Sequence, residues 1–386
     1  MSDQSAYRNI EKKKTNGVHH TIDWILFFAI WPIIGAGLVT MSSFLGNSAF
    51  FEHQIVLVGV AFAAFFILSF VDFRFLKRTG VLVALFVGIC LVLVSLFFVG
   101  HVSRGAQSWF RLGLLSIQPS DPAKVILILV LAKYFSRRHI EIANIRHILV
   151  SGVYALVMFM LILIQPNFGD AIIVFLIWLG MVLVSGISKK HLLTVFFIGA
   201  ISFTGLWVFA FKDYQKARIM TFIHPLADIR GAGYNAYQST IAVGSGQVLG
   251  KGIGYGTQSK LNFLPEYQTD FIFAAFSEEW GLIGVLMLWT LYGIVIWRVI
   301  ENAMHGSSNF EILYGLGVAI MLMTNFTVNV GMNMGLLPVT GVPIPFMSYG
   351  GSHLVTEFIA LGILMGMRRY RRTTGKDIVK NEMVGI

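Results

Sequence analysis

Runs of mainly apolar residues recur along the whole chain, and each is about as long as a helix that crosses a bilayer. A hydrocarbon core about 30 Å thick is spanned by roughly 20 residues of α-helix. The candidate spans are approximately 22–43, 54–72, 79–99, 119–136, 146–164, 170–186, 191–211, 270–298, 309–334 and 351–368. The sequence therefore predicts an all-α polytopic membrane protein with about ten transmembrane helices.

Charged side chains are too scarce to cover a water-exposed surface. Only 12% of the 386 residues are charged and 56% are hydrophobic, whereas roughly a quarter of a soluble domain is charged. The formal charge of +10 comes from short clusters between the apolar runs. This distribution fits membrane topology better than a nucleic-acid-binding surface, so we expect no nucleic acid partner.

Lysine and arginine lie mainly in an N-terminal tail (1–21), after every second predicted span, and around 368–372. Such residues favour the cytoplasmic side of a membrane. We therefore expect a membrane domain at 22–368, with the N-terminal tail and a C-terminal tail (369–386) both cytoplasmic. The long connection 212–269, between the seventh and eighth spans, is then extracytoplasmic, and we expect it to be ordered.

Asp270 lies where this long connection meets the eighth span. A partly buried carboxylate near the membrane surface gains proton affinity, which suits it to act as a general base. The alternative is structural, because Thr269 or Asp270 could cap the amino terminus of the helix.

Further ionisable residues lie within the predicted spans. Asp121 and Lys124 are three residues apart on the fourth span, so they share a helix face and can form an ion pair. Charges at membrane depth are costly and often functional, although a pair that only fixes helix packing is equally compatible with the pattern. Glu278, Glu279 and Glu357 could form a polar network or serve packing.

Glycine recurs between 231 and 256 in the long connection. The run is not a phosphate-binding P-loop, because no glycine lies five residues before Gly250 and neither Ser nor Thr follows Lys251. Together with Arg218 and Lys260 it would suit a phosphate-bearing or acidic substrate, unless these charges are simply solvated. A second connection, 335–351, is apolar but contains three prolines, so we expect it to fold back into protein.

Several long motifs occur in the order found in one known family. They are GAQSW at 105–109, QPSDPAK at 118–124, GAGYNAYQSTIAVGSG at 231–246, GKGIGYGTQSKLNFLPEYQTDFIFA at 250–274, EEWG at 278–281 and GLLPVTGVPIPFMSYGGS at 335–352. The chain resembles the SEDS family (shape, elongation, division and sporulation). Its short tails and the segment DYQKARI at 213–219 favour the RodA branch over the division paralogue FtsW.

The resemblance implies a peptidoglycan glycosyltransferase that polymerises lipid II at the outer face of the bacterial cytoplasmic (inner) membrane during cell elongation. The catalytic aspartate of the family corresponds to Asp270, and its intramembrane acid and lysine pair corresponds to Asp121 and Lys124. Substrate-binding roles are implied for Trp109, Asp121, Lys124, Arg218, Gln238, Ser239, Lys251, Gln258, Glu266 and Thr269.

The resemblance also implies cofactors and partners. A divalent cation, Mg or Mn, is expected without defined ligands, and no organic cofactor is expected. The partners would be lipid II and undecaprenyl-linked glycan, a class B penicillin-binding protein that crosslinks peptides, and other membrane proteins of the elongation complex.

The chain departs from the family pattern at several positions. The family usually has Glu at the position of Asp121 and an acid at the position of Asn167, whereas this chain has an acid at Asp170 instead. Gln268 replaces a His and His353 replaces a small residue. The role of the acid near Asn167 is therefore not carried over.

Two other functions share the ten spans, namely a flippase for the lipid-linked precursor and a non-catalytic scaffold that recruits a transpeptidase. A flippase would need polar groups along a path through the bilayer. The densest group of motifs here collects at the predicted external face, which favours the enzyme.

Overall fold

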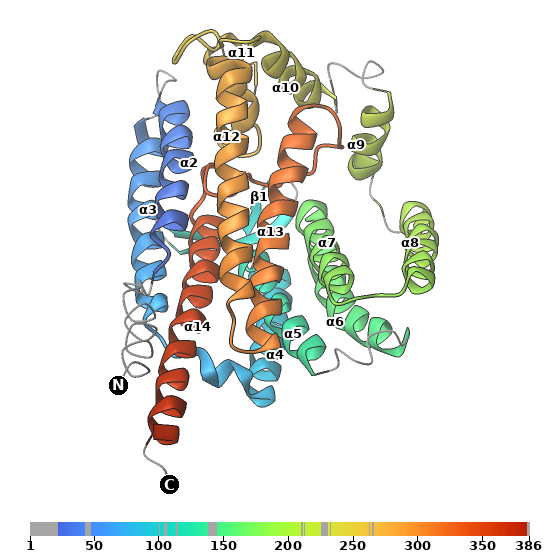
Figure 1. Cartoon of the computed structure of the whole chain (residues 1–386). Helices are drawn as coiled ribbons and strands as arrows, with labels where there is room; N and C mark the ends of the chain where they lie inside the picture. The colour runs from blue at the N-terminus through green and yellow to red at the C-terminus, as the bar shows by residue number, and fades with distance from the viewer. Residues whose placement is uncertain are drawn as a thin grey trace, which may run out of the picture.

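The computed structural model describes residues 22–42, 48–99, 101–103, 106–112, 115–137, 145–209, 211, 213–224, 231, 233–261, 263–264 and 266–383. The predicted tail 1–21 lies outside these residues. A helix occupies each predicted span (Figure 1). These helices are α2 (Trp24–Ser42), α3 (Ser48–Ser69), α4 (Thr79–Val99), α5 (Ser120–Ser136), α6 (Ile145–Ile164), α7 (Phe168–Val184), α8 (Lys189–Phe209), α12 (Ile272–Met304), α13 (Asn309–Asn333) and α14 (Gly351–Met383).

Most of these helices are suited to lipid. Among the described residues, α2, α3, α4, α6, α8, α12 and α13 are long and apolar enough to cross a membrane, and α7 is a shorter apolar helix. Large apolar side chains point outward, including Phe209, which is 89% exposed. Such a surface is unfavourable in water and favourable in hydrocarbon. The prediction of a polytopic helical membrane protein is confirmed.

α13 lies at the centre of the bundle, where it packs against α5, α7 and α12. A Cβ atom on Gly317 of α13 would lie only 2.4 Å from the Cγ2 atom of Ile128 on α5. Small residues that let helices approach this closely are typical of membrane bundles. α14 packs along α3, and α2 packs along α12.

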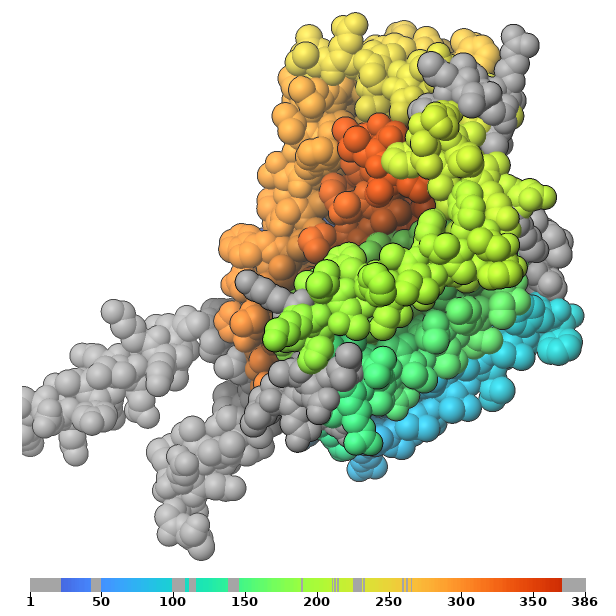
Figure 2. Space-filling view, turned by 90° about the vertical axis from the view of Figure 1, so that its right-hand side faces the viewer, coloured from blue at the N-terminus to red at the C-terminus, as the bar shows by residue number. Residues whose placement is uncertain are grey.

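α8 is the least integrated of the long helices. No residue of its apolar segment Lys190–Phe209 is buried, and Figure 1 shows it at the edge of the bundle beside α7. Just after its end, the ring of Phe211 lies 5.2 Å from that of Phe168. Figure 2 shows a hollow on this side, between orange α12 and the yellow-green residues of α8 and the segment after it, with orange-red residues at its floor.

The connection between α4 and α5 contains a small antiparallel sheet that the sequence did not predict. Its strands are β1 (His101–Ser103), β2 (Ala106–Leu112) and β3 (Leu115–Ile117), in the order β1-β2-β3. Phe110 pairs with Ile117 between the second and third strands. β1 and β3 have three residues each, which is too short to show an alternating pattern in the sequence.

The described residues of the long connection 212–269 include three helices. They are α9 (Asp213–Ile223), α10 (Tyr234–Ser245) and the single turn α11 (Thr257–Lys260). α10 packs against α12 and α13. The other short helix, η1 (Phe73–Lys77), joins α3 to α4.

The start of α2 and the charged part of α14 lie at the same end of the bundle. The guanidinium of Arg298 is 2.6 Å from the carboxylate of Asp23, and that of Arg368 is 3.7 Å from it. Figure 1 shows α10 and α11 at the opposite end. The predicted topology requires this arrangement, because it puts the two tails and the connection 212–269 on opposite sides of the membrane. α14 continues to Met383, through the region expected to be a tail.

Candidate active site

Asp270 ends a tight turn, residues 266–270, directly before α12. The backbone N–H groups of Thr269 and Phe271 both donate to the carbonyl of Glu266, at 3.1 and 3.3 Å. The N-cap position of α12 is Phe271, which has no side-chain capping bond. The alternative that Thr269 or Asp270 caps this helix is therefore wrong. Asp270 is half-buried, so it keeps access to the surface of the protein.

Two asparagines on α13 fix the backbone at this position. The side-chain amides of Asn329 and Asn333 each donate to the carbonyl of Asp270 at 3.0 Å. Asn333 in turn accepts a bond from the hydroxyl of Ser239, at 2.9 Å to its carbonyl and 3.1 Å to its side chain. The carbonyl of Asp270 is thus tied to both α13 and α10. Sequence reasoning missed these asparagines, although an asparagine at every fourth position from Asn325 in an apolar span is a detectable signal.

The apolar connection 335–350 folds back against this turn, as predicted. The hydroxyl of Ser348 donates to the carbonyl of Thr269 at 2.7 Å, and the N–H of Tyr349 donates to the carbonyl of Gln268 at 2.8 Å. Gly341 has a φ of +74°, and a Cβ atom there would lie 3.4 Å from Oδ2 of Asp270. This glycine therefore faces the candidate base directly.

Glu357 holds the same connection from the side of α14. Its Oε2 atom accepts the N–H of Phe346 at 2.9 Å. Phe346 has a φ of +60°, a conformation that is costly for a residue other than glycine and persists only where the surroundings enforce it. Glu357 thus acts on the shape of the connection.

Lys124 is the centre of a buried ion cluster. Its ammonium group lies 2.9 Å from Oδ1 of Asp121 and 2.9 Å from Oδ1 of Asp170, and all three side chains are buried. The predicted pair of Asp121 and Lys124 is present. The second carboxylate was not anticipated, because Asp170 is on α7, 46 positions away from the lysine.

Asp170 is the best-satisfied carboxylate of this cluster. Its Oδ2 atom accepts bonds from Gln118, Ser120 and Asn167 at 2.6, 2.5 and 2.7 Å. Asn167 is also the N-cap of α7, where its side chain accepts the N–H of Asp170. Asn167 thus caps α7 and binds Asp170, and Asp170 in turn reaches the lysine.

A direct packing contact joins the ion cluster to the candidate base. A Cβ atom on Gly169 would lie 2.4 Å from the carbonyl oxygen of Thr340. Thr340 precedes Gly341, which faces Asp270. The amino terminus of α7, held by Asp170, therefore supports the part of the connection that contacts Asp270.

The glycine-rich loop, residues 246–256, wraps around two buried glutamates of α12. Oε1 of Glu278 accepts Lys251 Nζ at 2.6 Å and the N–H of Thr257 at 2.8 Å, and Oε1 of Glu279 accepts the N–H of Gly254 at 2.8 Å. These donors are already bonded to carboxylates of the protein, so the loop does not form an open phosphate-binding site. Lys251 was predicted to bind substrate, but its ammonium group is paired with Glu278.

The other residues implied in substrate binding lie around this end of the bundle. Trp109 is half-buried on β2, Arg218 is exposed on α9, and Gln238 is half-buried on α10. The side-chain Oε1 atoms of Gln238 and Gln258 are buried and have no hydrogen-bond partner. The structure links Ser239, Glu266 and Thr269 to Asp270 through the bonds described above.

The described residues contain no group of three or more His, Cys, Asp or Glu side chains that could hold a metal ion. Mg²⁺ is commonly bound by one or two carboxylates together with substrate phosphates. A cation here would therefore take part of its ligands from substrate and water.

These features define a class of protein, namely a polytopic membrane protein with a fixed, half-buried carboxylate at the end of the bundle away from its termini. The family model for FtsW, RodA and SpoVE, described as cell cycle protein, matches residues 19–373. The chain belongs to this family.

Relatives and solved structures agree with this assignment. The chain is 38% identical over 294 residues to the peptidoglycan glycosyltransferase MrdB of Escherichia coli K12, which covers 75% of this chain and 78% of the relative. A chain solved in work on structural coordination of polymerization and crosslinking by a peptidoglycan synthase complex aligns with a TM-score of 0.77 and 30% identity, over 90% of this chain and 98% of that one. The rod shape determining protein RodA of Thermus thermophilus aligns with a TM-score of 0.68 and 29% identity, over 90% of this chain and 97% of that one.

Proposed function

We propose that this protein is a peptidoglycan glycosyltransferase that polymerises lipid II into glycan strands, with Asp270 as the general base. The observation that carries the proposal is the geometry at Asp270. Its backbone carbonyl is fixed by two asparagines, its carboxylate faces a glycine without a side chain, and the residue keeps access to the surface. Fixed geometry of this kind is what a general base requires.

The reaction joins two lipid-linked sugars. A hydroxyl group of the acceptor sugar attacks the anomeric carbon of the donor, the bond from that carbon to the lipid diphosphate breaks, and the diphosphate leaves with the bonding electrons. Asp270 accepts the proton of the attacking hydroxyl. Because a diphosphate leaves well once its charge is met, a second carboxylate that protonates the leaving group, as in many glycosidases, is not required.

Positive charge near the leaving diphosphate would come from the basic residues of the connection 212–269. Arg218, which is exposed on α9, is one of them. A divalent cation, Mg or Mn, is the further candidate. When bound, such an ion would neutralise diphosphate charge.

The hollow beside α8 suits the long polyprenyl tail of such a substrate. α8 carries exposed apolar side chains along its length, and it is packed loosely against the bundle. An undecaprenyl chain could therefore lie between this helix and the bundle while its headgroup reaches the connection 335–350.

The placement in the cell follows from the same proposal. Both termini would be cytoplasmic, and Asp270 would lie at the outer face of the bacterial cytoplasmic membrane. We assign the protein to cell elongation because of the segment 213–219, with the division paralogue as the alternative. A class B penicillin-binding protein would supply the peptide crosslinking, together with membrane proteins of the elongation complex.

A flippase for the lipid-linked precursor is the second candidate. The buried cluster of Asp121, Lys124 and Asp170 is the observation that favours it, because polar groups at membrane depth can line a transport path. Asp121 and Asp170 both pair with Lys124, and Asp170 also bonds to Asn167, which suits a structural brace better than a path. Within the described residues, Oδ2 of Asp121 is the one atom of these carboxylates that is buried without a partner.

Polymerisation in detergent tests the proposal, because detergent removes the two sides that a flippase needs. Purified protein with fluorescent lipid II should form polymer, and Asp270→Asn should abolish it while leaving thermal unfolding unchanged. Gln268→Asn, beside the base in the same turn, is the matched control. Polymer formation by Asp270→Asn at a rate close to wild type would reject Asp270 as the base.

A further inference from the structure

The glycine-rich loop (246–256) exposes four apolar side chains beside Gln247 and Lys251, and the two carboxylates that it surrounds are turned inward. The exposed apolar side chains are Val248, Leu249, Ile253 and Tyr255, with Leu249 78% and Tyr255 71% exposed. Glu278 and Glu279, around which the loop wraps, are buried. A loop that faces water normally has the opposite arrangement, because solvated charges and buried apolar groups are favoured there.

Several backbone groups of this loop are also bonded within the protein. The N–H groups of Lys251 and Gly252 donate to the carbonyls of Glu278 and Glu279, both at 3.0 Å, and that of Gly254 donates to the Glu279 carboxylate at 2.8 Å. Irregular backbone is tolerated at membrane depth only when its polar groups find protein partners. The N–H groups of Lys251, Gly252 and Gly254 meet this condition, although a loop in water would have no need to.

The loop is attached to the lipid-facing surface of α12. α12 is kinked at Gly281, which has a φ of +64° and lies against Gly250. Beyond the kink, the N–H groups of Leu282 and Ile283 donate to the carbonyls of Gln247 and Val248 at 2.9 and 3.2 Å. Val248 and Leu249 therefore lie at the same height as the first turn of the lipid-facing helix.

The depth of this junction follows from the length of α12. The uncharged part of the helix after the kink runs from Leu282 to the residue before Arg298, which is in the ion network with Asp23 at the other end of the bundle. At 1.5 Å per residue, Leu282 lies about 24 Å from Arg298 along the helix. A hydrocarbon core is about 30 Å thick. The uncharged helix is therefore too short by itself, and the first turn after the kink lies inside the hydrocarbon.

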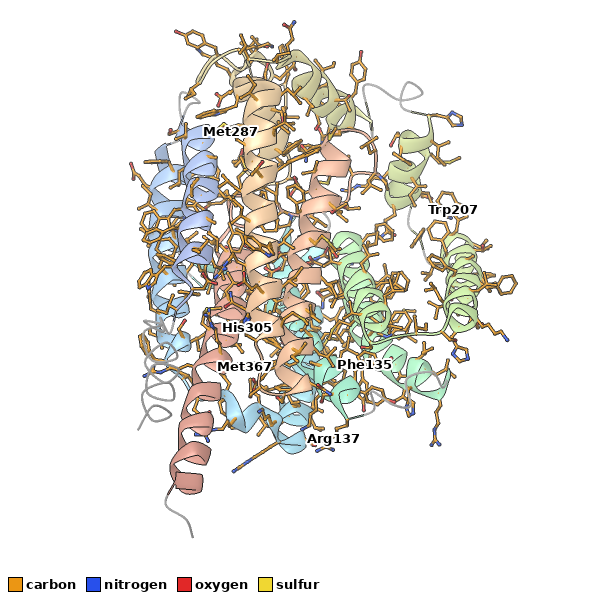
Figure 3. The ribbon with its side chains drawn as sticks, viewed as in Figure 1. Phe135, Arg137, Trp207, Met287, His305 and Met367 are labelled. Carbon is orange, nitrogen blue, oxygen red and sulfur yellow. The ribbon has the colours of Figure 1, made fainter. Side chains whose placement is uncertain are left out.

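Exposed apolar side chains continue from the loop onto this helix. Leu282, Leu286 and Met287 are each at least half exposed, and Figure 3 places Met287 toward the upper end of α12, far from His305 at the lower end. The apolar surface of the loop is thus continuous with a surface that faces lipid.

We infer that the glycine-rich loop inserts into the membrane leaflet at the end of the bundle away from the termini, with Val248 and Leu249 in the acyl region and Tyr255 at the headgroups. The inserted loop adds apolar surface at the end of α12, where the uncharged part of the helix is shorter than the hydrocarbon core. Tyrosine is enriched at the interface of membrane proteins, which fits its place at the outer edge of the loop. The ligand of this surface is the lipid bilayer itself.

The insertion can be measured with an environment-sensitive fluorophore on a single cysteine. Cys90 is the only cysteine of the chain, so Cys90→Ser provides the background for Leu249→Cys, labelled with a nitrobenzoxadiazole dye. Leu286→Cys is the reference position in lipid, and the exposed Lys260→Cys is the reference in water. The labelled proteins are placed in nanodiscs of phosphatidylethanolamine and phosphatidylglycerol, with monodisperse gel filtration as the check of folding.

The position of the dye is then read with two quenchers. At position 249 we expect emission shifted to shorter wavelength, strong quenching by lipids that carry a nitroxide near the headgroup end of the acyl chain, and loss of the iodide quenching seen at position 260. Iodide quenching equal to that at position 260 would overturn the inference and leave the patch free for a protein partner. Protection from both quenchers would also overturn it, because the loop would then pack on protein.

Tyr255→Cys provides a second label position if the variant at 249 does not fold, and it should be reached by both quenchers. The readout is optical and needs no substrate. A failure of the inference is therefore distinguishable from a failure of the proposed glycosyltransferase activity, and only the identity of the leaflet as the outer one depends on that proposal.

Discussion

The ammonium group of Lys124 on α5 lies 2.9 Å from a carboxylate oxygen of Asp170 on α7. This contact joins two helices through a buried ion pair, and Asp121 supplies a second carboxylate on the other side of the lysine. Because Gly169 packs on Thr340, the same contact also determines where the connection opposite Asp270 lies.

Replacing Lys124 should have a large effect on stability. Lys124→Met leaves two buried carboxylates without a counter-charge, and breaking a buried ion pair in this way costs about 3–5 kcal/mol. We expect a clear fall in the thermal unfolding temperature of the purified protein. Asp170→Asn should cost less, because Lys124 then remains paired with Asp121. Equal losses in the two variants would contradict this account of the cluster.

Gly169→Ala tests the packing path from this cluster to the base. The new Cβ atom would lie 2.4 Å from the carbonyl oxygen of Thr340, so the connection must shift. Overpacking of this kind typically costs 1–3 kcal/mol. A displaced near-attack geometry can cost about a hundredfold in rate. We expect kcat for lipid II polymerisation to fall more than KM changes.

Gly59→Ala is the matched control for this variant, because a Cβ atom there has no neighbour within 4 Å. It should retain wild-type kcat and stability. A Gly169→Ala protein with unchanged kcat would show that the connection does not position the base.

Asn333→Ala removes one of the two donors to the carbonyl of Asp270. The carbonyl of Asp270 and the hydroxyl of Ser239 then each have one hydrogen-bond partner fewer. Leaving a buried polar group without its partner lowers the free energy of unfolding by about 1–3 kcal/mol. We expect lower kcat in the polymerisation assay together with a modest loss of stability. Asn325→Ala is the control eight residues earlier on the same helix, because the Oδ1 atom of Asn325 is buried without a partner. If both variants have the same kcat, the asparagine bonds do not position Asp270.

A double-mutant cycle separates the two roles open to Lys251. If its ammonium group serves to neutralise the buried Glu278, Lys251→Met and Glu278→Gln should each destabilise the protein, and the double variant should lose less than the two losses added together. Coupling energies for residues in contact are about 0.5–3 kcal/mol. If Lys251 instead binds the substrate diphosphate, Lys251→Met should raise KM while the unfolding temperature stays at the wild-type value.

The long apolar runs made the helices of the membrane domain predictable. α4 was predicted at 79–99 and is found at Thr79–Val99. α12 was predicted at 270–298 but extends over Ile272–Met304. Its start differs because residues 266–270 form a turn, and its end differs because hydropathy reports the thickness of the membrane and not the full length of a helix.

The candidate site was only partly predictable. Asp270 and the pair of Asp121 and Lys124 could be found because charged residues in apolar surroundings are unusual. The bonds from Asn333 to Asp270 and from Lys124 to Asp170 join residues 63 and 46 positions apart. Contacts at such separations depend on how helices pack, which one sequence does not reveal.

The network at Asp23 predicts a specific pH dependence of stability. Burial alone would raise the pKa of this carboxyl group, but bonds from the N–H of Leu26, the amide of Asn302 and the guanidinium of Arg298 outweigh it, so the pKa lies below its ordinary value of 3.8. A carboxylate with a lowered pKa stabilises the folded state above the ordinary pKa, and this contribution is lost as the pH falls through the folded-state pKa.

Asp23→Asn should therefore be less stable than wild type by a constant amount between about pH 5 and 8, on the order of 1–3 kcal/mol for the loss of bonds to a charged group. The difference should shrink as the pH falls below about 4, because protonation then removes the same charge from the wild-type protein. Unfolding temperatures of both proteins across this range measure it. Asp72→Asn is the control, because the pair of Asp72 and Arg74 is exposed and such pairs contribute little. A difference that grows on acidification would mean that Asp23 is held in its protonated form in the folded protein.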